Sequence, residues 1–302
     1  MIAISPRQLE VFVAIALSGS VRAAAERLHL TQPAASMALS ELERLLGEPL
    51  FDRRLRRLHL NAHGRRLLPL AQEILERMQE FGRGSGGAVL RGELRLGASN
   101  TVGNYLVGDL LGGFVAAHPQ VAVKLHVDNT AAIVAGVLDY SLDLGCVEGS
   151  AAHPDLELLP WRDDRLCVCA PPSHPLAQRR RLRPEHFAGA RWILREAGSA
   201  TREQTERALA MLPPGETVLE LDQSEAIKQA VIAGLGLALL PAVAVADAAA
   251  GGRLAVLRTP FLQLQRPLSL VLHRRRYRSS LLQALLERIA ATAARGRRRD
   301  YA

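Results

Sequence analysis

The sequence has few of the features that mark secreted, membrane or metal-binding proteins. Three cysteines occur among 302 residues, and this odd number does not form a disulfide framework. Residues 1–10 lack a basic segment followed by an apolar run, so no signal peptide is predicted. Apolar runs such as 235–246 are too short to span a bilayer. These absences predict a soluble, cytoplasmic protein with no membrane partner.

Signatures of catalysis and of cofactor binding are also missing. The sequence contains no Gly-x-Ser-x-Gly elbow, no His-Glu-x-x-His zinc motif and no P-loop. Cys167 and Cys169 would lie on the same face of a strand, but no nearby Cys/His set completes a metal site. We therefore expect no metal, no cofactor and no enzyme. The two thiols are interpreted as core residues, with redox sensing as the alternative.

Positive charge is present, but it lies at the two ends of the chain. The net charge of +8 divides into +3 for residues 1–84, −2 for residues 85–272 and +7 for residues 273–302. Basic ends predict an anionic partner such as nucleic acid. A chain of this length also predicts more than one domain.

Helix signals near the N-terminus follow one another closely. A helix over 6–17 comes first, then Ser20 and Thr31 each stand as an N-cap before a helical stretch. Pro33 fits the first turn of the second stretch, and Gly47 ends it. This order predicts a helix-turn-helix, whose second helix enters the DNA major groove.

A basic segment follows directly. Leucines interleave with the basic residues of 51–60, so the segment can form a β-hairpin wing that presents cations to phosphates. The alternative is a solvated basic loop. Residues 51–66 contain Arg53, Arg54, Arg56, Arg57, Arg65 and Arg66.

The next helix carries a heptad pattern. Asn61 is a suitable N-cap, and apolar residues recur behind it at coiled-coil spacing. Two copies of this helix could pair and hold two reading heads on one DNA; the alternative is a helix packed on its own domain. The seam consists of Leu67, Ala71, Ile74, Met78 and Phe81.

Beyond the glycine-rich segment 82–92 the pattern changes to alternating strands and helices. It begins with a strand over 93–98 and ends with a helix to about residue 294. This order predicts an α/β domain with mainly parallel sheets. Residues 295–302 are predicted to be disordered.

Polar clusters stand where predicted strands give way to helices. In open α/β sheets such positions meet at a ligand cleft, where helix N-termini favour anions. The alternative is that the same residues only cap helices. The predicted effector-binding residues are Ser99, Asn100, Thr101, Thr130, Ser199, Thr201 and Arg202, the last of which adds a guanidinium.

With these pieces placed, the chain resembles the LysR-type transcriptional regulators along nearly its whole length. The N-terminal match lies in RQLEVFVAIALSGSVRAAAERLHLTQPAASMALSELERLLGEPLFDRR and in HLNAHGRRLLP. The remaining match lies in GELRLGASNTVGNYLV, DLGCVEG, REAGSATRE and SEAIKQAVIAGLGLALLP. Of these motifs, GASNTVGNY and REAGSATRE are most like the carbon-fixation and sulfur-assimilation branch.

The resemblance implies an α/β fold class in three parts. A winged helix-turn-helix occupies 1–62, a linker and dimerisation helix with a hinge occupies 63–87, and an effector-binding domain occupies 88–302. That domain would have two lobes like those of periplasmic binding proteins. The first lobe would span about 93–163 and 266–302, and the second about 164–265.

The resemblance also implies partners. These are double-stranded DNA, a small effector in the cleft, further copies of the chain in a homodimer or homotetramer, and RNA polymerase. The recognition helix departs from many relatives, because Met37-Ala38-Leu39 replaces a stretch that often carries Arg or Lys. The expected DNA contacts are Ser20, Arg22, Thr31, Gln32, Pro33, Ala35, Ser36, Arg53, Arg54, Arg56 and Arg57.

These observations lead to one functional hypothesis and two rivals. The chain is predicted to be a sequence-specific DNA-binding transcription regulator that responds to a small anionic metabolite. The first rival is a ligand-independent DNA binder with a vestigial cleft. The second is a solute-binding protein or an enzyme that has kept the α/β domain.

Overall fold

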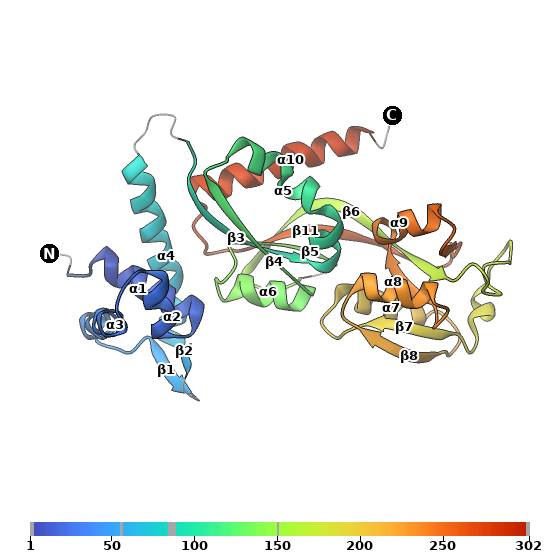
Figure 1. Cartoon of the computed structure of the whole chain (residues 1–302), viewed down its shortest axis with the longest axis horizontal. Helices are drawn as coiled ribbons and strands as arrows, with labels where there is room; N and C mark the ends of the chain where they lie inside the picture. Colours follow the sequence, from blue (N-terminus) through green and yellow to red (C-terminus); the bar gives the residue numbers. More distant parts are fainter. Residues whose placement is uncertain (1–2, 55–56, 84–88, 150, 300–302) are drawn as a thin grey trace.

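The computed structural model describes residues 3–54, 57–83, 89–149 and 151–299. An N-terminal helical unit with a small hairpin is followed by one long helix and by a two-lobed α/β part (Figure 1). The glycine-rich segment predicted as a hinge lies partly outside the described residues, at 84–88.

The N-terminal unit is the predicted winged helix-turn-helix. The side chains of Ser5, Ser20 and Thr31 each accept a backbone N–H of the following helix, and Gly19 and Gly47 end helices in the left-handed conformation. Its elements are α1 (Pro6–Ser18), α2 (Val21–Arg27), α3 (Gln32–Leu46), β1 (Phe51–Arg54) and β2 (Arg57–Leu60), the two strands being antiparallel.

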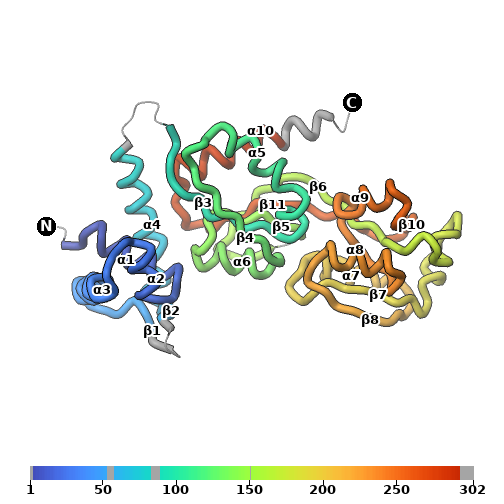
Figure 2. Tube along the Cα trace, in the orientation of Figure 1, coloured from blue at the N-terminus to red at the C-terminus, as the bar shows by residue number. Residues whose placement is uncertain are grey.

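The long helix α4 (Ala62–Arg83) leaves this unit (Figures 1 and 2). Asn61 caps it by accepting the N–H of Gly64 at 2.8 Å. Leu68 and Ala71 are buried in the core of the N-terminal unit. The first half of α4 therefore belongs structurally to the DNA-reading unit.

The first lobe is a sheet with helices on both faces. α5 and α10 cover one face and α6 covers the other (Figure 1). Its elements are β3 (Gly92–Ser99), the π-helical turn η1 (Val102–Leu106), α5 (Val107–Ala117), β4 (Val121–Asp128), α6 (Thr130–Leu138), β5 (Leu144–Glu148) and α10 (Ser280–Arg299).

Two long strands run from the first lobe into the second: β6 (Leu156–Ala170) and β11 (Gln265–His273). The second lobe has two apolar cores of its own, one on each side of β6. Its elements are the short helix η2 (Pro184–Phe187), β7 (Arg191–Arg195), α7 (Ala200–Leu209), β8 (Glu216–Leu221), α8 (Ser224–Ile232), β9 (Ala238–Pro241), α9 (Ala242–Ala250) and β10 (Ala255–Leu257).

The prediction of mainly parallel sheets was wrong. β3 pairs in parallel with β4 and β5, and β7 with β8, but β6 and β11 are antiparallel to each other and to every other strand that they pair with. The seven-stranded sheet has the order β10-β6-β11-β5-β3-β4, with β9 also on β6. The two crossing strands make it mixed, because one leads out of the first lobe and the other leads back.

The expected disorder at the C-terminus was also wrong, because α10 continues to Arg299; residues 300–302 lie outside the described part. Arginine is a good helix former, so a run of arginines can extend a helix that is already packed. None of the helices that the structure describes has both the length and the hydropathy of a membrane span.

Candidate functional site

The N-terminal half of α3 presents a small polar surface. Thr31, Gln32, Pro33 and Ser36 are exposed, as a groove-reading face requires. Ala35 is completely buried in the core of the unit, so the expectation that it touches DNA was wrong. It packs inward because helix positions three or four apart share one face, and Ala35 lies on the same face as the buried Leu39 and Leu42.

One residue of this face was not among the predicted contacts. Met37 is 72% exposed, a large apolar side chain with no core to cover it. The only basic residue of α3, Arg44, is paired with Glu41 at 2.6 Å. The face therefore offers hydroxyl, amide and apolar groups in place of cations.

The flanking DNA-contact predictions have different outcomes. Ser20 is half-buried and caps α2, while Arg22 is exposed and pairs with Glu26 at 3.0 Å. The hairpin is present, and Arg53 stands opposite Leu58 in its register. Position 56 and the side chains of the arginines at 53, 54 and 57 lie outside the described residues.

The predicted heptad seam of α4 divides into two parts. Leu67 is partly buried and Ala71 fully buried against the N-terminal unit itself, so this part of the seam packs within the chain. Ile74 and Met78 are each 46% exposed and Phe81 is 90% exposed. The outer half of α4 thus carries an apolar stripe that this chain leaves uncovered.

Between the lobes lies a buried polar cluster that contains most of the predicted effector residues. All except Arg202 are buried: Ser99, Asn100, Thr101, Thr130, Ser199 and Thr201. Asn129 and Ser199 cap α6 and α7, as predicted for helix starts that face a cleft. The cluster at 99–101 was expected to cap a helix, but Thr101, which directly precedes the π-helical turn η1, makes no side-chain cap hydrogen bond.

Arg266 joins the two lobes and was missed by sequence reasoning. Its guanidinium donates to Thr201 Oγ1 at 2.9 Å in the second lobe and to Thr101 Oγ1 at 3.2 Å in the first. It is 4% exposed and is neutralised by Asp164 at 2.7 Å, with Glu148 at 3.6 Å. No local motif marks Arg266, because β11 brings it back across about a hundred residues to Asp164.

Two polar atoms of this cluster have no hydrogen-bond partner among the described residues. They are Ser99 Oγ and Glu148 Oε2, both buried. The other oxygen of Glu148 accepts from Thr101 Oγ1 at 2.6 Å. Buried polar groups normally have partners, so unpaired atoms between two lobes mark a place where a polar ligand can bind.

The lobes touch beside this cluster, where the N–H of Ala131 donates to the carbonyl of Gly198 at 3.1 Å. Gly198 has φ +86°, and a Cβ there would meet Ala131 Cβ at 3.1 Å. Glycine is therefore required for this close approach. The contact brings the start of α6 next to the start of α7.

Arg202, which the prediction placed among the effector-binding residues, makes its ion pairs outside the cluster. Its guanidinium binds Glu206 at 2.5 Å, Glu220 at 2.7 Å and the carbonyl of Arg195 at 2.6 Å. Hydrogen bonds to Glu220 and Glu206 raise its pKa above the ordinary value. Its charge is committed to those carboxylates, so a cleft ligand has to use other groups.

A second buried charge cluster joins α4 to the first lobe. Arg276 binds Glu76 at 2.8 Å and Asp143 at 2.9 Å, and it donates to Gln72 at 3.3 Å. Arg95 binds the same Asp143 at 2.5 Å. Burial raises the pKa of Glu76, and the nearby Arg276 charge opposes that shift. The DNA-reading unit is thus attached to the effector lobes through α4.

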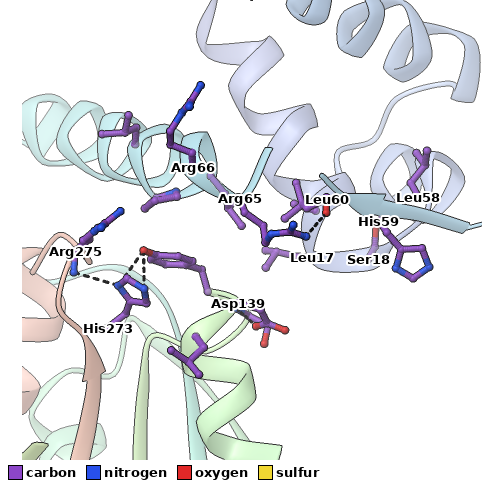
Figure 3. A pocket seen from close by; sticks show the side chains of 18 of the residues that line it. Leu17, Ser18, Leu58, His59, Leu60, Arg65, Arg66, Asp139, His273 and Arg275 are labelled. Carbon is purple, nitrogen blue, oxygen red and sulfur yellow. Dashed lines mark hydrogen bonds between the residues drawn. The ribbon is translucent and has the colours of Figure 1, made fainter. Parts of the chain in front are cut away.

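A cavity of about 1240 Å³ lies beside this junction, between the N-terminal unit and the first lobe (Figure 3). Tyr140, in the left-handed conformation with φ 63°, contributes to the core of the N-terminal unit. Its hydroxyl lies 2.9 Å from Nδ1 of His273, and the two rings are tilted by 35° with their centroids 4.3 Å apart. Tyr140, held by His273 of its own lobe, therefore connects the first lobe to the N-terminal unit.

The Tyr140–His273 pair predicts a pH dependence. Burial lowers the pKa of His273; Asp155 opposes this shift, and Arg275, His153 and Arg276 reinforce it. The unfolded chain therefore binds this proton first, so the stability that neutral His273 provides is lost as pH falls below about 6.5. We expect a lower urea midpoint at pH 5.5 than at pH 7.5. His273→Gln should reduce that difference, whereas His126→Gln, at an exposed site, should leave it unchanged.

Comparison with protein families identifies both halves of the chain. Residues 6–65 match the model described as "Bacterial regulatory helix-turn-helix protein, lysR family". Residues 87–294 match the model described as "LysR substrate binding domain".

Individual relatives agree with these matches. The chain is 39% identical over 288 residues to the "Uncharacterized HTH-type transcriptional regulator YeiE" of Escherichia coli K12, covering 94% of this chain and 96% of the relative. It is 33% identical over 299 residues to a "Probable RuBisCO transcriptional regulator" of Cyanophora paradoxa, covering 94% and 91%. The CcmR regulatory domain of Synechocystis PCC6803, solved in complex with 2-PG, is 28% identical with a TM-score of 0.62, covering 67% of this chain and 98% of that domain.

Proposed function

Because this chain belongs to the LysR family of transcriptional regulators, it binds DNA through its helix-turn-helix, and we propose that a small anionic metabolite between its lobes controls that binding. The observation that carries the proposal is the buried inter-lobe cluster, in which Ser99 Oγ and Glu148 Oε2 have no hydrogen-bond partner within the described part of the chain. The capped starts of α6 and α7 meet beside it. Helix N-termini favour anions, and hydroxyl groups can donate to them.

The charges of the inter-lobe cluster limit which chemical groups a ligand can carry. Arg266 is neutralised by Asp164 and lies near Glu148, so no uncommitted cation of the described cluster is available to a ligand. We infer that the anionic group is held by hydroxyl and backbone N–H donors, and that a separate hydroxyl or amine of the ligand donates to Glu148. The relative CcmR, which was solved with 2-PG, supports a small polar metabolite.

We also propose that the chain works as a homodimer or homotetramer. The exposed stripe of Ile74, Met78 and Phe81 supports pairing of two α4 helices. Paired heads would read two half-sites, and the effector would change their spacing and so the bend of the DNA. In this proposal the complex works in the cytoplasm, where the DNA is, and acts on RNA polymerase. The relatives named as RuBisCO regulators favour genes of carbon fixation as targets.

DNA binding has two separable components. Gln32 is exposed at the start of α3 and can pair with an adenine edge, so Gln32→Ala should cost about 1–3 kcal/mol on the specific site only. Arg53→Ala should weaken binding to every duplex and reduce the salt slope by about one. Fluorescence anisotropy with specific and random duplexes at several salt concentrations measures both. An equal effect of Gln32→Ala on random DNA would contradict its assignment.

Calorimetry of the full chain tests the effector proposal, with 2-PG and inorganic phosphate as probes. Saturable binding should be lost in Thr101→Val and Thr201→Val, which remove hydroxyl donors while keeping side-chain volume. Arg202→Ala should keep it, because Arg202 is committed to Glu206 and Glu220. If the regulator binds its promoter but neither probe nor any other small anion binds, the ligand-independent alternative is correct. If the full chain binds specific and random DNA equally at physiological salt, a role as a solute-binding protein or an enzyme becomes the better interpretation.

A further inference from the structure

Two thiols in the core of the second lobe serve neither DNA reading nor the inter-lobe cluster. Cys167 and Cys169 are both buried, on the same face of β6, and their sulfur atoms are 3.8 Å apart. The backbone at both positions is fixed, because Cys167 pairs with Leu240 of β9, and Cys169 pairs with Ala238 of β9 and Val256 of β10. This arrangement places two soft sulfur ligands side by side.

The distance between the two sulfur atoms limits which kind of atom can bond to both of them. For an atom bonded to both sulfurs at about 2.3 Å, the length of a zinc–thiolate bond, 3.8 Å corresponds to an angle at that atom of about 110°. A linear two-coordinate ion would need the sulfurs to be farther apart. A disulfide would need them to close to about 2.05 Å between positions that two neighbouring strands hold in place. A bent, pyramidal centre fits the observed spacing.

A cavity also reaches the first of the two thiols, that of Cys167. This cavity of about 200 Å³ is lined by Cys167 and by apolar side chains that include Val245, Ala249 and Leu264. The hydrogen bond with Cys169 and the charge of Arg165 lower the pKa of Cys167, which favours the reactive thiolate. No group of three or more His, Cys, Asp or Glu in the described part of the chain is placed to hold a metal ion, so the site offers two sulfurs and an apolar space.

We propose that Cys167 and Cys169 form a dithiol site for a trivalent arsenic compound with one organic substituent. Two thiols displace the two hydroxyl groups of R–As(OH)₂, which gives R–As(S–Cys)₂ and two molecules of water. Each thiol proton leaves with a hydroxyl group, and arsenic keeps its oxidation state. The organic substituent enters the apolar cavity. Soft sulfur ligands favour such a centre.

The site is placed to affect the inter-lobe cluster. Asp164, which holds Arg266, lies three residues before Cys167 on β6. A bridging atom at the thiols therefore acts on the strand that carries this carboxylate between the lobes.

The test treats the folded full chain with phenylarsine oxide, which hydrates to the dihydroxy form, in the presence of excess glutathione. Intact-mass spectrometry should show one phenylarsenic group per chain, removed by 2,3-dimercaptopropanol. Cys167→Ser and Cys169→Ser should each lose this glutathione-resistant adduct. Cys146→Ser is the matched control and should keep it, since Cys146 is buried on β5 without a second thiol.

Three results would overturn the proposal. They are no adduct on the folded wild-type chain, an adduct that persists in either single serine variant, or an adduct that maps to Cys146. Alanine variants at 167 and 169, with circular dichroism spectra that match the wild type, separate loss of the site from loss of the fold.

Discussion

Replacing Arg266 by methionine is expected to lower the free energy of unfolding of the two lobes by about 3–5 kcal/mol, the usual cost of leaving buried partners of an ion cluster unpaired. Arg266 is almost completely buried and binds Asp164 at 2.7 Å. Methionine keeps much of the side-chain volume, so the effect reports the lost charge and not a cavity. Urea unfolding followed by circular dichroism measures it.

The control for Arg266 lies on the adjacent crossing strand. Arg162 of β6 binds Asp109 at 2.8 Å, but both side chains are exposed, by 43% and 61%. Arg162→Met should therefore cost about 0–1 kcal/mol. If both variants lost the same small amount of stability, Arg266 would not join the lobes as we describe.

Arg266→Met should also weaken ligand binding, an effect that the loss of stability alone does not explain. Thr101 and Thr201, one in each lobe, both accept from Arg266. Without the guanidinium the lobes lose their common partner, and calorimetry should show weaker binding of an inter-lobe ligand. Specific DNA binding without effector should remain, because α3 and the wing belong to a separate core.

Local signals in the sequence predicted local structure well. The caps at Ser20, Thr31 and Asn61 are observed where they were expected, because each depends on hydrogen bonds within a few residues of the cap. The burial of most of the polar cluster agrees with its expected position between helix starts. Ala35 was misplaced although its spacing from Leu39 and Leu42 already puts it on the packed face of the helix.

Long-range features could not be read in the same way. The role of Arg266 depends on Asp164 and Thr101, which are 102 and 165 residues away in the sequence. The direction of β6 and β11 also depends on how the two lobes are connected, and periodicity carries no information on strand direction. Arg202 was predicted to bind the effector because it follows a helix cap. Its guanidinium instead forms ion pairs with Glu206 and Glu220.

We expect the junction between α4 and the first lobe to carry the signal from an effector to the DNA-reading unit. Its charges are buried: the side chains of Arg276 and Asp143 are 6% and 5% exposed. One guanidinium binds both Asp143 of the first lobe and Glu76 of α4. We therefore expect this cluster to carry much of the movement of the lobes to the DNA-reading unit.

Arg276→Met should disconnect the two halves. The buried Asp143 and the partly buried Glu76 would lose their shared cation, and Asp143 would keep Arg95. We expect a cost near the lower end of the usual about 3–5 kcal/mol, which corresponds to opening of α4 about a hundredfold more often. Hydrogen exchange of the backbone amides near Glu76 measures this opening. Arg278→Met is the matched control two residues away, since Arg278 pairs with Glu157 at the surface. Affinity for a half-site should be kept in both variants, and effector-induced DNA bending should be lost only in Arg276→Met. Bending that survives in Arg276→Met would show that the signal passes through another contact, of which the Tyr140–His273 pair is the first to test.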